Sequence, residues 1–388
     1  MTTPTKAPTP ASTPEPERGT TSTRLDAWEG ITSSPVRPAP ARLVWVTFAA
    51  GVLTGLLVWL LLSNVALGVV TGYLVYVIST YVAHRVVAGR RVGLDQLMRA
   101  LVYGAFALAL LPLISVLLTV ALNGVGRAVN PEFLQQTMNG ITGLADQQYA
   151  DGDAPFIGGA YHAILGTLII TGLATVISVP IGMFAAIYLV EYAGKSNLTR
   201  AIRFFVDVMT GIPSIVAGLF AFALFGVIFG IGTKNAMAGA IALSVLMIPT
   251  VVRNSEEMLR IVPNELREAS LALGVPKWRT IYKVVLPTAA SGLASGVTLA
   301  IARVIGETAP LLVAVGGFYA LNYNPLSGPM QTLAVYAYEM FTKPLNPGVR
   351  DPSLERAWAA ALILVVIVIA LNLTARLIAK LFAPKSGR

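Results

Sequence analysis

Glu268-Ala-Ser-Leu-Ala-Leu-Gly274 is a short stretch between two long apolar ones, and Leu286-Pro287 follows twelve residues after its glycine. Leucine and alanine recur in and beside it at helical spacing. Asn264 is the predicted N-cap of this helix, Gly274 suits its C-terminal cap, and Pro276 prevents continuation. The stretch therefore predicts an exposed helix that another protein grips, or else an amphipathic helix that lies on the lipid surface.

The composition around this stretch is that of a membrane protein. The chain is 55% hydrophobic and only 12% charged, whereas soluble proteins are about 25% charged. Long apolar runs predict an all-α polytopic membrane protein with about eight transmembrane helices. The predicted spans are residues 43–62, 65–84, 100–122, 160–190, 206–231, 236–252, 288–319 and 357–380.

Charge orients these spans. The connection 124–157 is mostly acidic, whereas the stretches after the second span, around 191–205, in 253–287 and at the C-terminus are basic. Positive residues favour the cytoplasmic side, so eight spans put all basic segments inside and both termini in the cytoplasm. The net charge of +9 thus marks orientation, and no nucleic-acid partner is predicted. Residues 1–41 hold eight prolines and few large apolar side chains, which predicts a disordered cytoplasmic tail.

Several features predict close helix packing or an irregular backbone. Gly292 and Gly296 lie four residues apart among other small side chains, a pattern typical of closely packed membrane helices. Thr210-Gly-Ile-Pro-Ser214 either lines a polar path or forms an ordinary kink.

Two charged residues within the seventh span, Arg303 and Glu307, are candidates for an anion path. An ionised residue at a helix centre costs roughly 2.5–3.5 kcal/mol on insertion scales, so such residues are often functional. An arginine fork suits a tetrahedral oxyanion. The alternative is a structural ion pair, because the i,i+4 spacing puts both on one helix face. Arg253 follows the sixth span, where it extends the anion path or anchors the span at the membrane boundary.

The sequence predicts no enzyme. No nucleophile–base pair is visible, and the chain has no cysteine and only two distant histidines, so no metal site is predicted. Gly194-Lys195-Ser196 ends like a phosphate-binding loop, but Leu189 stands where the upstream glycine belongs. The chain therefore does not hydrolyse ATP by itself.

Taken together, the motifs resemble those of permeases in ATP-binding-cassette (ABC) importers. Glu268-Ala269-Ser270, then Gly274, Ile281 and Leu286-Pro287 look like their EAA loop. Gly211-Ile-Pro-Ser-Ile-Val216 and Gly306-Glu-Thr-Ala-Pro310 are similar to segments of phosphate-importer permeases, and Ala186-Ile-Tyr-Leu-Val-Glu-Tyr192 favours the A-type. Ser270 stands where the motif usually has alanine.

This resemblance implies a type I ABC importer permease bundle over residues 100–388, with a cytoplasmic EAA loop at 253–287. Residues 42–99 are then two extra N-terminal transmembrane helices whose role the family does not supply. The implied site residues are Arg303, Glu307 and Arg253 for substrate translocation, and Glu268, Ala269, Ser270, Gly274, Leu286 and Pro287 for ATPase coupling.

The implied function is the permease subunit of an ATP-driven phosphate importer in the bacterial plasma membrane. Its implied partners are a C-type phosphate permease subunit, two copies of a cytoplasmic ATP-binding subunit and a phosphate-binding protein. This chain needs no cofactor of its own, since the partner ATPases bind ATP and Mg. The alternatives are a permease for another oxyanion and an ATP-independent anion transporter.

Overall fold

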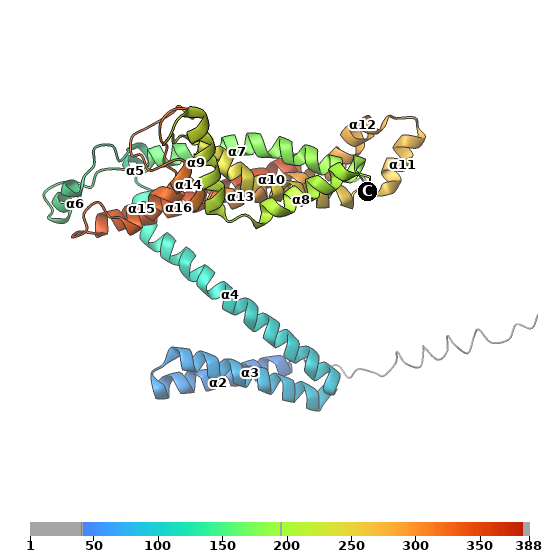
Figure 1. The fold of residues 1–388 in the computed structure, drawn as a ribbon. Coiled ribbons are helices and arrows are strands. Elements are labelled where there is room, and N and C mark those ends of the chain that lie inside the picture. The colour runs from blue at the N-terminus through green and yellow to red at the C-terminus, as the bar shows by residue number, and fades with distance from the viewer. Residues whose placement is uncertain (1–39, 41, 195, 383–388) are drawn as a thin grey trace, which may run out of the picture. The chain divides into compact units, whose positions relative to one another are not determined.

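The computed structural model describes residue 40 and residues 42–194 and 196–382 of the chain. The predicted disordered tail thus lies outside the described residues, apart from Pro40. All regular structure within the described ranges is helical, which confirms the predicted class. The chain divides into two compact units, Met1–Ile114 and Ser115–Arg388 (Figure 1). This division falls inside the long helix α4 (Arg90–Ala128), as does the predicted boundary between residues 99 and 100.

In the first unit, helices α2 (Arg42–Leu62) and α3 (Val65–Ala88) form a hairpin joined by Ser63 and Asn64. Two glycines from each helix face each other across the hairpin. A Cβ on any of the four would lie 2.7 Å from a carbonyl oxygen of the opposite helix, so only glycine permits this approach. The four residues are Gly51 and Gly55 on α2, and Gly68 and Gly72 on α3.

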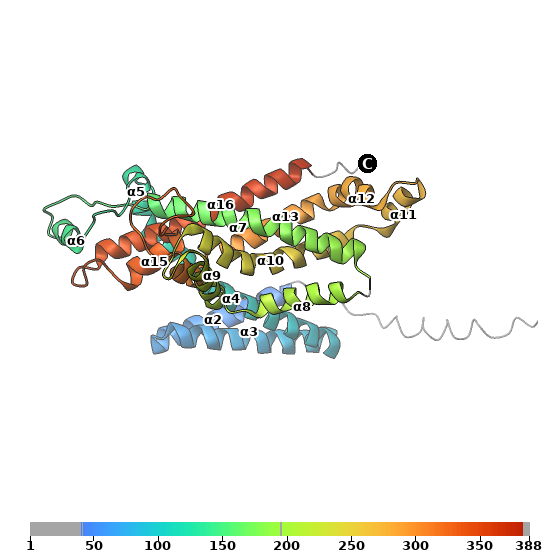
Figure 2. The same cartoon turned by 45° about the horizontal axis from the view of Figure 1, so that its top comes forward.

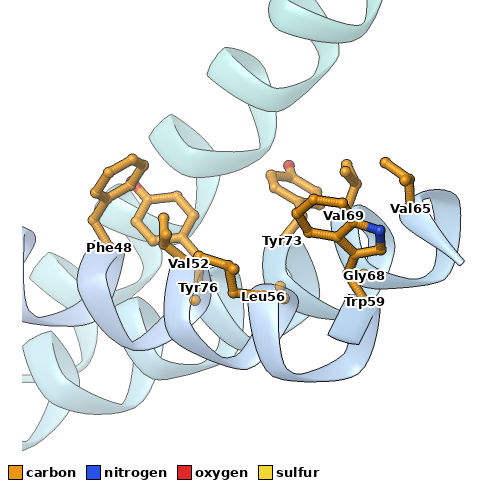
Figure 3. Close-up of a pocket in the computed structure, with 12 residues that line it drawn as sticks. Phe48, Val52, Leu56, Trp59, Val65, Gly68, Val69, Tyr73 and Tyr76 are labelled. Carbon is orange, nitrogen blue, oxygen red and sulfur yellow. The ribbon is translucent and has the colours of Figure 1, made fainter. Parts of the chain in front are cut away.

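Aromatic side chains of α2 and α3 line an apolar groove of about 350 Å³ along this hairpin (Figure 3). The rings of Phe48 and Tyr76 meet edge to face at 5.9 Å. Tyr73 donates a hydrogen bond to the carbonyl of Ala100 at 3.2 Å, which ties the hairpin to the first part of α4.

The second unit contains the remaining helices, which come from both long spans and short connecting segments. Its long elements are α7 (Tyr161–Ile187) with the π-helical turn η1 (Tyr188–Tyr192), α10 (Ala236–Ile261), α13 (Leu286–Val304) and α16 (Asp351–Phe382). Its shorter elements are α5 (Pro131–Gln135), α6 (Gly143–Ala150), α8 (Asn197–Gly211), α9 (Ser214–Phe229), α11 (Asn264–Ala272), α12 (Lys277–Thr280), η2 (Ile281–Val285), α14 (Ala309–Ala314) and α15 (Leu333–Thr342).

Helix α10 lies at the centre of the second unit, where it packs against α7, α13 and α9. Its first half is rich in alanine, glycine and serine, and most of these residues are fully buried. Small side chains let helix backbones approach closely where lipid supplies no hydrophobic driving force. The predicted packing role of Gly292 and Gly296 is confirmed, because added Cβ atoms there would meet Met258 Sδ at 2.4 Å and Asn254 Cβ at 2.9 Å on α10.

Two of the predicted spans are wrong in shape. The span expected at 206–231 is instead the bent pair α8 and α9, whose axes differ by 108°. Pro213 lacks a backbone N–H and forces Ile212 into an extended conformation, which ends α8 at Gly211. The span expected at 288–319 begins earlier, at Lys277, and its helix ends at Val304.

Seven single helices are long and apolar enough to cross a membrane, or eight spans if the bent pair counts as one. The chain is therefore a multi-pass membrane protein. In the second unit, α11 and α12 lie at one end and α5 and α6 at the opposite end (Figures 1 and 2). The basic 253–287 stretch and the acidic 124–157 connection thus lie at opposite ends of this bundle, as the charge pattern predicted.

Candidate functional site

The predicted exposed helix is α11, and its C-terminal cap is as expected. Gly274 has φ +77°, a left-handed conformation that glycine adopts without steric cost. Its N–H donates to Leu271 O at 2.9 Å, and Val275 N–H donates to Ser270 O at 3.3 Å. These two bonds form a Schellman motif, which satisfies carbonyls that the helix end leaves free.

The predicted N-cap is wrong by one position. Pro263 is the capping residue, and it makes no side-chain capping bond. Asn264 is instead the first helical residue, and its Oδ1 accepts a hydrogen bond from Arg267 Nη1 at 3.2 Å. The proline fixes φ near −60° and has no N–H to satisfy, so the chain enters the helix directly after it.

The surface of α11 and its neighbours is open. None of its residues is buried, and Glu268 and Ala269 are both exposed. Large apolar side chains beside them are also exposed. Exposed apolar surface is costly in water and is typical of a surface that a partner covers. The exposed apolar residues are Leu266, Leu271, Leu273, Trp278 and Tyr282.

Ser270 makes a contact that alanine could not make. Its hydroxyl lies 2.9 Å from Thr280 Oγ1, which ties α11 to α12. Leu286 and Pro287 stand where the π turn η2 passes into α13. Proline removes a donor and clashes with the carbonyl four residues earlier, which favours the wider π turn before it. Leu286 packs against a buried cluster at the base of the loop.

Among the candidate anion residues, Arg253 lies within α10 and not at its end. The helix continues to Ile261, nine residues beyond the predicted end of the span at residue 252. Arg253 Nη2 donates to Asp207 Oδ1 on α8 at 2.6 Å. Both side chains are more than half exposed within this single chain.

Arg303 lies in the last turn of α13 and donates from Nη1 to Thr250 Oγ1 on α10 at 3.3 Å. Thr250 and Arg253 are three residues apart, so they lie on the same face of α10. Arg303 of α13 therefore contacts α10 about one turn from Arg253.

Glu307 does not share a helix face with Arg303, contrary to the prediction. Helix α13 ends at Val304, and Glu307 lies in the connection to α14. In the described part of the chain, no ion pair within 4.0 Å joins these two residues. The helix has therefore ended before Glu307, and α14 begins only at Ala309.

Two further residues, which the sequence analysis did not identify, form ion pairs at these sites. Asp207 is the carboxylate beside Arg253, and an acid in the otherwise apolar stretch 204–209 was the available signal. Arg267 adjoins the EAA motif and pairs with Glu191 at 2.9 Å. Within the described residues, no three His, Cys, Asp or Glu side chains gather in a metal-binding arrangement.

The chain is similar to known proteins across this whole region. The family described as "Binding-protein-dependent transport system inner membrane component" matches residues 178–388. A "Phosphate transport system permease protein PstA 1" from Mycobacterium tuberculosis is 44% identical over 276 residues, which are 71% of this chain and 85% of that protein. A "Phosphate transport system permease protein PstA" from Mycobacterium leprae is 41% identical over 70% of this chain and 84% of that protein.

A solved structure shares the fold. It is the crystal structure of a bacterial alginate ABC transporter in complex with an alginate pentasaccharide-bound periplasmic protein. Its matching chain is 14% identical, with a TM-score of 0.51 over 76% of this chain and 97% of that chain. At this identity the likeness concerns the fold alone.

Proposed function

The chain belongs to the binding-protein-dependent transport system inner membrane component family, and on that premise we propose that it is the permease subunit of an ATP-driven importer of inorganic phosphate. One observation carries the choice of substrate: the 44% identity to a phosphate transport permease over 85% of that protein. The two arginines beside one face of α10 supply a chemical reason, because guanidinium forks bind tetrahedral oxyanions through paired hydrogen bonds.

In this proposal the chain forms half of the translocation pore. A second phosphate permease subunit of the C-type supplies the other half, and a phosphate-binding protein delivers the anion from outside. Arg303 and Arg253 meet the permeating phosphate, and Glu307, in the connection between α13 and α14, holds or releases it. Both termini are cytoplasmic, so the EAA loop faces the cytoplasm of the bacterial cell.

Two copies of a cytoplasmic ATP-binding subunit bind and hydrolyse ATP with Mg, and one of them grips the EAA loop of this chain. The exposed apolar residues around α11 support this contact, since a partner that covers them removes apolar surface from water. Glu268, Ala269, Ser270 and Gly274 shape the gripped helix, and Leu286 and Pro287 join it to α13. Closure and reopening of the ATPases then switch the open side of the pore.

Uptake of radiolabelled phosphate tests this function in proteoliposomes that contain the complete complex. We expect uptake that requires ATP, Mg and the binding protein. An importer for another oxyanion shares the arginines and would prefer that anion in competition with phosphate. Phosphate uptake without ATP would identify an ATP-independent transporter, which has no use for the docking surface on α11.

A further inference from the structure

One side chain of helix α11, that of Arg267, joins it to the ends of α7 and α10. Its Nε and Nη2 donate to Glu191 Oε1 at 3.0 Å and 2.9 Å. Its Nη2 also donates to Leu259 O at 2.9 Å, and its Nη1 donates to Val262 O. A single guanidinium therefore joins α11 to η1, at the end of α7, and to the last turn of α10.

This contact is sheltered, unlike the rest of α11. The Arg267 side chain is 15% exposed and that of Glu191 is 6% exposed, whereas no residue of α11 counts as buried. Apolar packing thus does little to fix α11, and its position depends on polar contacts at its inner side. An ion pair with this degree of burial is screened far less by water than a surface pair.

The elements that Arg267 joins are themselves firmly packed. Ala186 near the end of α7, Leu259 of α10 and Val285 of η2 belong to one buried cluster. Helices α7 and α10 also pack along each other. A displacement of α11 that keeps the Arg267 contacts must therefore move the ends of both helices together.

We propose that Arg267 and Glu191 form a positioning pair that transmits movement of the ATPase-bound helix α11 to α7 and α10. This inference rests on the proposed function, because it assigns the pair a place in the coupling of ATP hydrolysis to transport. The guanidinium faces inward, away from the exposed apolar side chains, so the pair acts after the ATPase has docked and does not take part in docking.

The test is the ratio of phosphate taken up to ATP hydrolysed by the complete complex in proteoliposomes. Arg267→Ala leaves Glu191 buried without its partner, which threatens folding. The decisive variant is therefore Arg267→Met combined with Glu191→Gln, which removes both charges and keeps much of the side-chain volume. Arg267→Lys keeps the charge but loses the planar fork. Arg260→Ala is the control, because the Arg260 side chain lies nearby and is exposed, and Glu256 keeps Arg203 as a partner when Arg260 is removed.

We expect the double variant to assemble, to bind the ATPase subunits and to hydrolyse ATP. Its uptake per ATP should fall about tenfold, within the range typical of coupling between sites. Arg267→Lys should give a ratio of uptake to ATP hydrolysis between those of the double variant and the unmodified complex. Arg260→Ala should give the same ratio as the unmodified complex. A wild-type ratio in the double variant would overturn the proposal. Uptake that falls only in step with the amount of assembled complex would also overturn it, since the pair would then be structural.

The unmodified complex separates this inference from the function on which it rests. If that complex hydrolyses ATP but takes up no phosphate, the proposed substrate is wrong. The same variants are then measured with the anion that the complex does transport.

Discussion

Arg253 holds its positive charge beside the carboxylate of Asp207 on the neighbouring helix α8. A phosphate that reaches Arg253 competes with this carboxylate for the guanidinium. We therefore expect Asp207→Asn to bind phosphate several-fold more tightly than the unmodified complex when no binding protein is present. Equilibrium binding of radiolabelled phosphate to the purified complex measures this. Glu256→Gln is the control, because Glu256 pairs with Arg203 and Arg260 and not with Arg253. Unchanged binding in Asp207→Asn would place Asp207 outside the anion path.

A second prediction concerns the side chain of Arg303. Arg303→Gln should abolish phosphate uptake, and Arg303→Lys should rescue it poorly, because the planar fork is lost. If Arg303 served only to neutralise Glu307, removal of both charges would restore transport. The structure places no ion pair between them among the described residues, so Arg303→Gln with Glu307→Gln should stay inactive while assembled. Uptake near wild type in this double variant would reject the transport role.

The sequence predicted these two arginines but not the residues that they contact. Arg303 and Arg253 attract attention in the sequence because a charge in or beside an apolar span is costly. Their contacts Thr250 and Asp207 are 53 and 46 residues distant along the chain. No local pattern encodes such a distance, since it depends on how α8, α10 and α13 pack. The same holds for Glu191 and Arg267, which are 76 residues apart.

Among the helices, the sequence predicted α11 well because its limits depend on local chemistry. Gly274 and Pro276 act through their own backbone preferences. The bent pair α8 and α9 was missed because hydropathy averages over a window, and Pro213 changes the direction of the chain without changing that average. Helix α13 was predicted too long for a related reason, since the residues beyond Val304 remain apolar after the helix ends.

The cap of α11 gives a prediction for this element. Gly274→Pro removes the N–H that bonds Leu271 O and forces a negative φ where the backbone has +77°. We expect it to abolish binding of the ATPase subunits and transport, while membrane insertion persists. Gly274→Asn is the matched control, because asparagine tolerates the left-handed conformation, and it should retain much of the binding. Co-purification of the ATPase subunits measures the difference.

Glu268→Lys tests the same helix without altering its cap. Glu268 is exposed on α11, so the change reverses a charge on the surface that we propose binds the ATPase. It should also abolish ATPase association. Recruitment at the wild-type level by both Gly274→Pro and Glu268→Lys would count against the docking role.

For the molecule as a whole, topology is the most direct test. The 39 residues of α4 make a helix of about 58 Å, roughly twice the thickness of a hydrocarbon core. We therefore expect its basic first turns to extend beyond the membrane on one side. A reporter fused after residue 92 should be cytoplasmic, and one fused after residue 140 should be exported. Protease or alkaline phosphatase reporters give the answer, and the reverse result would put the EAA loop on the wrong side.

The glycine contacts of the α2–α3 hairpin also bear on the order in which parts of the protein fold. The glycine–carbonyl contacts join Gly51 with Gly72 and Gly55 with Gly68, and a two-residue connection links the helices. Segments with local contacts fold fast, and chains fold from the N-terminus as they are synthesised. We therefore expect the hairpin to pair soon after both helices have left the ribosome, before the helices of the second unit are complete.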